Sequence, residues 1–188
     1  YFKFKKTKRL HDPIFFGNEN KYLKECISSG FVSYVGNFVN IFEDKICKYT
    51  KSKHSIATSS GTAALHLALN YYKIDKYCEV LLPSFTYVAT ANAIKYCNSN
   101  PNFVDIETDS LGVCPKKLEL YLKKIGIKKG KKLINKNTNK HIKALIVVHV
   151  FGFPAKINEI KKICRKYNIY LIEDAAEAVG SFFNKKHL

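Results

Sequence analysis

The chain has 188 residues, of which 46% are hydrophobic, and a formal net charge of +17. This length suits one domain or part of a larger one, and the hydrophobic fraction is enough to build a core. No run of about 18 apolar residues occurs, which excludes an ordinary membrane-spanning helix. The first residues also lack the long apolar core of a signal peptide. We therefore expect a cytoplasmic protein with no membrane partner.

The positive charge comes almost entirely from Lys, which is spread along the chain, whereas Arg occurs only at Arg9 and Arg165. Arg is the favoured residue for recognising phosphates and bases. The densest basic stretch, residues 126–141, lacks both Arg and the interleaved aromatics that bind single strands. We interpret this stretch as an exposed hairpin or loop with a turn at residues 137–139, and we expect no nucleic-acid partner.

The cysteines form no CxxC pair and no Cys/His cluster with the spacing of a zinc site. We expect reduced thiols in the core or on helix faces, as in the cytosol, and no metal. The six residues are Cys26, Cys47, Cys78, Cys97, Cys114 and Cys164.

Residues 1–50 read as a basic arm, 1–13, followed by two helices. Apolar residues recur at helical spacing from Glu19 to Ile27 and again from Phe38 to Tyr49, and core packing is the expected role of most of them. The chain contains no methionine, and its last residues, NKKHL, close no element. We therefore expect an N-terminal fragment of a longer protein.

From residue 51 onward, short apolar strands alternate with helical segments, which predicts an α/β fold with a mostly parallel sheet flanked by helices. The expected strands are 55–58, 79–82, 101–106, 143–150 and 169–172, and the expected helices are 63–69, 87–96, 115–125 and 157–167.

The turn Ser59-Ser60-Gly61-Thr62 opens directly onto a helix that starts at Ala63. Free backbone N–H groups and the helix dipole at such a junction bind phosphate, and the hydroxyls of Ser60 and Thr62 add donors. An ordinary Ser or Thr helix cap is the other interpretation.

The stretch LIEDAAEAVG places Asp174, and then Glu177, directly after the last apolar strand. Ligands of open α/β sheets bind at the carboxyl ends of strands, and a carboxylate there needs a cation or good donors. One cation that fits is the protonated ring nitrogen of pyridoxal 5'-phosphate (PLP), although a solvated acid is the simpler interpretation. Tyr87, at a strand-to-helix junction, could stack on a flat ring; core packing is its other interpretation.

Three stretches in this order, SGTAALHLAL, LLPSFTYVATANAI and VVHVFGFP…IYLIEDAAEAVGS, resemble the DegT/StrS-type nucleotide-sugar aminotransferases. These are PLP enzymes of the aspartate-aminotransferase-like fold type I. The front end, FFGNENKYLKECISSGFVSYVGNFVNIFE, resembles the subgroup that serves legionaminic acid and related surface sugars. The resemblance begins at Pro13 and covers nearly the whole remaining chain.

The resemblance implies roles for matching positions. Ser60, Gly61, Thr62 and Ala63 would hold the cofactor phosphate. Tyr87 would stack on the pyridine ring and Asp174 would pair with the ring nitrogen. Glu177 stands where many relatives have His or Gln near the phenolic oxygen of the cofactor.

The resemblance also implies what this chain lacks. The lysine that binds the cofactor covalently as a Schiff base is expected beyond Leu188, so no catalytic residue is assigned here. Lys185 and Lys186 fall in a surface hairpin that precedes it. Residues 51–188 would be the N-terminal part of the large PLP-binding domain, with the rest of that domain and the small domain absent.

The expected function is transfer of an amino group, from glutamate, to a keto group of a nucleotide-linked 4-keto-6-deoxy sugar for surface glycans, by a homodimer. Two alternatives stay open. One is sugar dehydration, which a few relatives perform with His in place of the lysine. The other is a non-catalytic fragment that binds partners through its basic surface.

Overall fold

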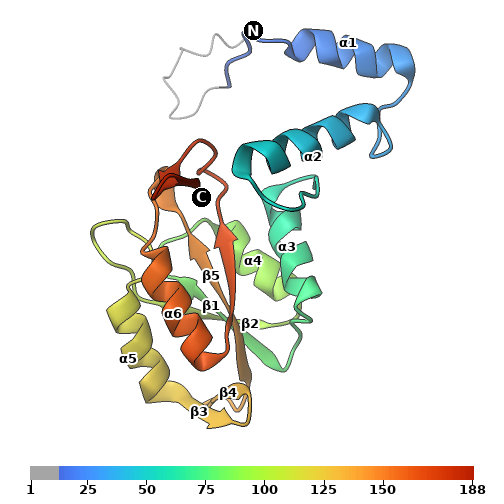
Figure 1. The fold of residues 1–188 in the computed structure, drawn as a ribbon. Coiled ribbons are helices and arrows are strands. Elements are labelled where there is room, and N and C mark those ends of the chain that lie inside the picture. The colour runs from blue at the N-terminus through green and yellow to red at the C-terminus, as the bar shows by residue number, and fades with distance from the viewer. Residues whose placement is uncertain (1–12) are drawn as a thin grey trace, which may run out of the picture.

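The computed structural model of the protein describes residues 13–188. Most of the basic arm expected at residues 1–13 therefore lies outside the described residues. Figure 1 shows a sheet covered by helices, with α1 (Glu19–Ser29) and α2 (Asn37–Thr50) extending from one end of it.

Four parallel strands form the centre of the sheet, in the order β2 (Asn100–Val104), β1 (Cys78–Pro83), β5 (His141–Val148) and β6 (Tyr170–Asp174). All of β1 and most of β5 are buried, as expected for strands covered on both faces. Because the four strands are parallel, their carboxyl ends meet at one edge.

A hairpin of β3 (Gly126–Lys129) and β4 (Lys132–Asn135) extends the sheet beside the start of β5, antiparallel to it. This is the basic stretch that the sequence predicted to be a hairpin or loop. Gly130, at φ 59°, makes its tight turn, and Asn139, at φ 56°, lies in the second turn that leads into β5.

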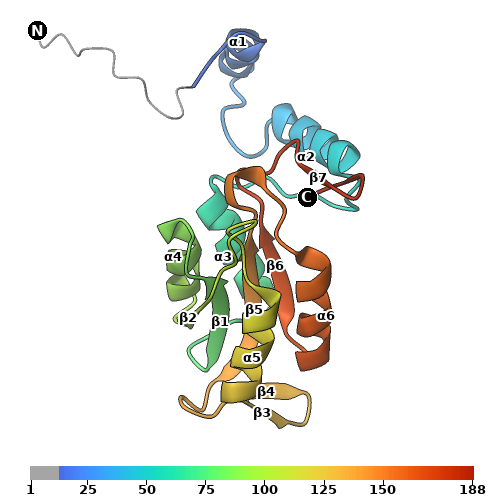
Figure 2. The same cartoon turned by 90° about the vertical axis from the view of Figure 1, so that its left-hand side faces the viewer.

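Helices cover the sheet in two separate layers, one on each face (Figure 2). Alternate residues of the strands pack against one layer or the other. Leu81 and Leu145 face α5 (Pro115–Ile125) and α6 (Ile157–Tyr167), whereas Leu82 and Ile146 face α3 (Gly61–Tyr71) and α4 (Val88–Tyr96). The expected bounds of α5 and α6 are confirmed, and α1, α2, α3 and α4 lie where helices were expected.

Three strand predictions need correction. The strand expected at 143–150 ends at Val148, because the chain begins a tight turn at Val150. Residues 55–58 are not a strand, because the segment passes beside α2 and not beside the sheet: the Ala57 N–H donates to Glu43 Oε1 at 2.7 Å. The strand expected to reach Ile106 ends at Val104, since Ile106 forms only an isolated bridge with Val113.

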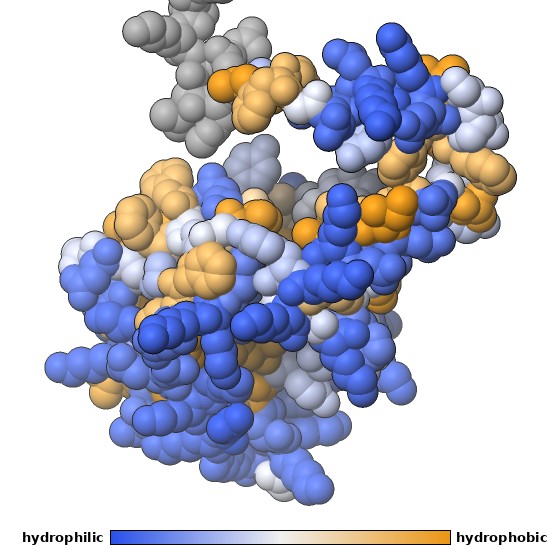
Figure 3. Space-filling view, turned by 45° about the horizontal axis from the view of Figure 1, so that its top comes forward, coloured by the Kyte–Doolittle hydropathy of each residue, from blue (hydrophilic) through white to orange (hydrophobic). Residues whose placement is uncertain are grey.

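The core packing expected for the two N-terminal helices is also wrong for this chain. Neither α1 nor α2 has a buried residue, because both lie off the end of the sheet. Their apolar side chains make orange patches in Figure 3. The large exposed ones on the two helices are Tyr22, Leu23, Ile27, Ile41, Phe42 and Tyr49.

After β5 the chain makes a short turn, η1 (Val150–Gly152), and after β6 it closes with a hairpin of β7 (Phe182–Phe183) and β8 (Lys186–His187). This confirms the hairpin expected at Lys185 and Lys186. Within residues 13–188 no helix combines the length and the apolar character needed to cross a membrane. All six cysteines are free thiols, three of them buried, as the sequence predicted.

Two leucines of α5 provide a matched test of the core. Leu122 is 1% exposed and packs between α5, α6 and the sheet, whereas Leu120 is 57% exposed. We expect Leu122→Ala to lower the free energy of unfolding by about 2–5 kcal/mol, and Leu120→Ala to change it by less than about 0.5 kcal/mol. Urea denaturation of the full chain measures both, and equal losses would contradict this packing.

Cys164 on α6 is expected to resist alkylation. Burial raises the pKa of the Cys164 thiol to about 12, and the thiolate is the form that reacts. At pH 8, iodoacetamide should modify half-buried Cys26 well before Cys164, as followed by mass spectrometry. In urea the two cysteines should react at similar rates; a fast Cys164 in the folded protein would show that α6 does not cover it.

Candidate cofactor site

A cavity of about 400 Å³ lies at the carboxyl ends of the parallel strands. It is lined by the loop before α4 (residues 85–87), the end of β5 with its exit turn (residues 148–151), and Asp174, Ala176 and Glu177 after β6. The strand-end acids and Tyr87, which the sequence singled out, therefore line one cavity.

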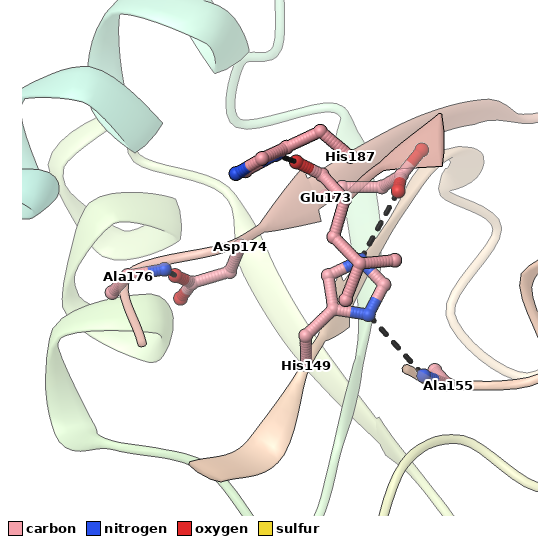
Figure 4. A network of polar contacts seen from close by, with 7 residues as sticks. His149, Ala155, Glu173, Asp174, Ala176 and His187 are labelled. Atoms are coloured by element: carbon pink, nitrogen blue, oxygen red, sulfur yellow. Dashed lines mark hydrogen bonds and ion pairs between the residues drawn. The ribbon is translucent and has the colours of Figure 1, made fainter. Parts of the chain in front are cut away.

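Asp174 is held in this cavity by both its backbone and its carboxylate. It pairs with Val148 in the sheet, and its carbonyl accepts a hydrogen bond from the His149 N–H at 3.1 Å. Oδ2 accepts from the Thr90 hydroxyl at 3.0 Å. Oδ1 accepts from the Ala176 N–H at 3.3 Å (Figure 4). Each carboxylate oxygen thus keeps capacity for another donor.

Tyr87 does not pack in the core, so that interpretation is wrong. The residue precedes α4 and is 78% exposed, with its side chain at the cavity. Phe85 and Phe151 line the same cavity and are also exposed. These aromatic side chains offer apolar faces that suit a flat ring.

Glu177 interacts with the exit turn of β5. Its Oε2 accepts from the Phe151 N–H at 2.9 Å, where Phe151 has a left-handed backbone, φ 52° and ψ 26°. The neighbouring Gly152, at φ 79°, lies so close that a Cβ would come within 2.9 Å of the Glu177 carbonyl oxygen. Glu177 therefore stabilises a tight turn that forms one wall of the cavity.

The turn at Ser60–Ala63 does not line this cavity, although the N-terminus of α3 lies at the same end of the sheet (Figure 1). Ser60 is an ordinary helix cap: its Oγ accepts from the Ala63 N–H at 3.2 Å. The Ala64 N–H bonds to the Ser60 carbonyl. Of the first helical N–H groups, those of Gly61 and Thr62 therefore remain for a ligand.

These residues fit PLP. Asp174 has acceptor capacity for a protonated ring nitrogen, exposed aromatic faces line the same cavity, and Gly61 and Thr62 offer N–H groups for a phosphate at the same end of the sheet. No lysine of residues 13–188 lines the cavity.

Thr90 and His149 are among the residues at this site that sequence reasoning missed. His149 is buried at the end of β5, and its Nδ1 accepts from the Ala155 N–H at 3.2 Å. Because a backbone N–H can only donate, Nδ1 carries no proton, and Nε2–H donates to Glu173 Oε2 at 3.1 Å (Figure 4). The sequence did offer a signal for His149, because this polar residue directly follows an apolar run at the end of a predicted strand.

This neutral tautomer of His149 can be tested. His149→Phe would leave the buried Ala155 N–H without its partner, and we expect a loss of about 1–3 kcal/mol in the free energy of unfolding. Glu173→Gln should lose under about 1 kcal/mol, because the amide oxygen still accepts from Nε2–H. Denaturation of the full chain measures both; a larger loss for Glu173→Gln than for His149→Phe would instead indicate a charged histidine.

A model of the DegT/DnrJ/EryC1/StrS aminotransferase family matches residues 15–188. GDP-perosamine synthase of Vibrio cholerae is 38% identical over 177 residues, which are 94% of this chain and 44% of that protein. The chain thus spans less than half of this relative.

Two solved structures share the fold. A DegT DnrJ EryC1 StrS aminotransferase from Brucella abortus superposes with a TM-score of 0.77 at 31% identity, covering 86% of this chain and 40% of that one. NtdA from Bacillus subtilis, solved with bound cofactor PMP, gives a TM-score of 0.72 at 28% identity, covering 86% and 33%. The expected fold, that of PLP-dependent transferases of fold type I, is confirmed. The chain belongs to the DegT/DnrJ/EryC1/StrS aminotransferase family.

Proposed function

We propose that the complete polypeptide carrying this chain is a PLP-dependent aminotransferase. It transfers an amino group, from glutamate, to the keto group of a nucleotide-linked 4-keto-6-deoxy sugar. The observation that carries the proposal is Asp174, a strand-end carboxylate that lines a cavity with aromatic walls and keeps acceptor capacity on both oxygens. The family assignment supports the same chemistry.

The residues of this chain bind and orient the cofactor. When bound, PLP supplies an electron sink for the carbanion that transamination requires. Asp174 keeps the proton on the ring nitrogen, because an adjacent carboxylate favours the charged form. Tyr87 covers a face of the ring, and the N–H groups of Gly61 and Thr62 bind the phosphate. Glu177 holds the exit turn of β5 at the edge of the cavity.

The lysine that completes the site is proposed to lie beyond Leu188. Lys185 and Lys186 belong to the β7–β8 hairpin and not to the cavity lining. We also propose that residues 51–188 form the N-terminal part of the large cofactor-binding domain, and that residues 1–50 form a separate arm with two helices. The position of α1 and α2 off the sheet supports this division.

The sugar is proposed at the level of its class. Vibrio cholerae GDP-perosamine synthase, by its name, favours a GDP-linked sugar. The narrower resemblance to the legionaminic-acid subgroup stays a prediction, as does the cytosolic location. A homodimer is proposed because the unburied apolar faces of α1 and α2 suit a protein interface.

The test is amino transfer by the complete polypeptide with PLP, glutamate and a nucleotide-linked 4-keto-6-deoxy sugar, followed as 2-oxoglutarate release. We expect Asp174→Asn to lower kcat/KM by about 10- to 100-fold, because a charge-assisted hydrogen bond to the ring nitrogen is lost. Asp105→Asn, which removes the same charge from a surface ion pair with Lys117, should change it less than about threefold.

Three results would contradict the proposal. A sugar that loses water and gains no amine would identify a dehydratase. Unchanged amino transfer in Asp174→Asn would remove the role of that carboxylate. Salt-sensitive binding of nucleic acid without any binding of PLP would favour the basic binding fragment.

A further inference from the structure

Two threonines connect the loop that carries Tyr87 to the carboxylate of Asp174. Thr90 lies in the first turn of α4 and is 1% exposed. Its Oγ1 is 3.0 Å from Asp174 Oδ2, a contact that spans 84 residues of sequence. The Oγ1 of Thr86 is 2.9 Å from the same Thr90 hydroxyl.

The chemistry of the three groups fixes the direction of both hydrogen bonds. An ionised carboxylate can only accept a hydrogen bond, so the one O–H group of Thr90 must donate to Asp174. The second bond therefore runs from the Thr86 hydroxyl, as donor, to Thr90 Oγ1. Two hydroxyl dipoles thus point in series toward the negative charge, at a partly buried place where such bonds strengthen one another.

An ordinary structural role for Thr90 would look different. A threonine within a helix commonly bonds a backbone carbonyl three or four residues earlier on its own helix. Thr90 instead donates to a side chain on β6, in a different layer of the fold. The other donor to this carboxylate, the Ala176 N–H, is longer at 3.3 Å.

The same two residues also fix the aromatic wall. Thr86 and Thr90 flank Tyr87 in the chain, and the Thr90 N–H donates to the Tyr87 carbonyl at 3.1 Å. A displacement of Thr90 would therefore move the carboxylate and the aromatic loop together. Glu177 and His149, which also stand at the cavity, hold other parts of its wall.

We propose that Thr90, supported by Thr86, is a positioning residue for PLP. It orients the Asp174 carboxylate toward the ring nitrogen and connects it to the loop that carries Tyr87. This inference rests on the proposed function.

The experiment measures PLP binding to the complete polypeptide by equilibrium dialysis and by the visible spectrum of the bound cofactor. Thr90→Val keeps the shape of the side chain but removes its proton, and we expect the dissociation constant to rise about tenfold or more, since a hydrogen bond to a charged group is lost. The spectrum should shift as well, because Asp174 no longer holds the ring proton as firmly. Thr90→Ser keeps the hydroxyl and should bind with the dissociation constant of the wild type.

Two further variants serve as controls. Thr86→Val leaves the Thr90–Asp174 bond in place, and we expect a smaller rise of about threefold. Thr108→Val changes an exposed threonine of a surface loop and should leave binding and spectrum unchanged. Thermal unfolding of each protein without PLP separates loss of fold from loss of binding. Recovery of binding in Thr90→Ser shows that the effect of Thr90→Val comes from the lost hydroxyl.

The outcomes distinguish this inference from the proposed function. Wild-type affinity and spectrum in Thr90→Val, together with lost affinity in Asp174→Asn, would overturn the role of Thr90 alone. No binding of PLP by the wild type would overturn the proposed function. Equal binding by Asp174→Asn would remove the role of that carboxylate and, with it, the role of Thr90. If Thr90→Val does not fold, Thr86→Val decides: wild-type affinity in that variant overturns the inference, and weakened affinity with intact folding supports it.

Discussion

The pairing of β5 with β6 is the constraint on which the cavity depends. Ile172 packs in the α3 and α4 layer, and because side chains alternate along a strand, Asp174 falls on the same face. That register brings its carboxylate to Thr90 on α4, while the intervening Glu173 turns to His149. A slip of one residue would exchange these two acids.

The three acids at and just after the end of β6, Glu173, Asp174 and Glu177, are bound by neutral donors and not by lysines, even though the chain carries a net charge of +17. Glu177 accepts a hydrogen bond from a backbone N–H, and Glu173 accepts one from the neutral His149. Asp174 accepts one from a hydroxyl and one from a backbone N–H. No Lys or Arg ion pair within residues 13–188 involves any of them. A ligand cation at Asp174 therefore has no protein cation to displace. The lysine charges act elsewhere: at the opposite end of β5, burial and the charges of Lys143 and Lys132 lower the pKa of His141.

Sequence reasoning was strongest where local chemistry decides the structure. Pro115 opens α5, and the apolar stripe of α6 fixed its bounds. Asp174 was found because it directly follows an apolar strand. Thr90 was missed, since its partner lies 84 residues away and helical spacing carries no sign of it. Residues 55–58 were wrongly predicted to be a strand because their local pattern is strand-like. They have no neighbouring strand to pair with, and a local sequence pattern does not reveal pairing partners.

For the two N-terminal helices, the sequence predicted the secondary structure correctly but not what the helices pack against. Their apolar stripes correctly predicted helices, but helices of this length are marginal unless an apolar face is buried. Among residues 13–188, α2 is tied to the rest by Glu43 to Ala57 and by the packing of Tyr49 against His187 in β8. The residue before that hairpin also approaches the exit turn of β5, since a Cβ built on Gly152 would come within 2.9 Å of Ser181 Oγ. The segment from Ser181 to His187 therefore lies against both α2 and the exit turn of β5, and that turn lines the cofactor cavity.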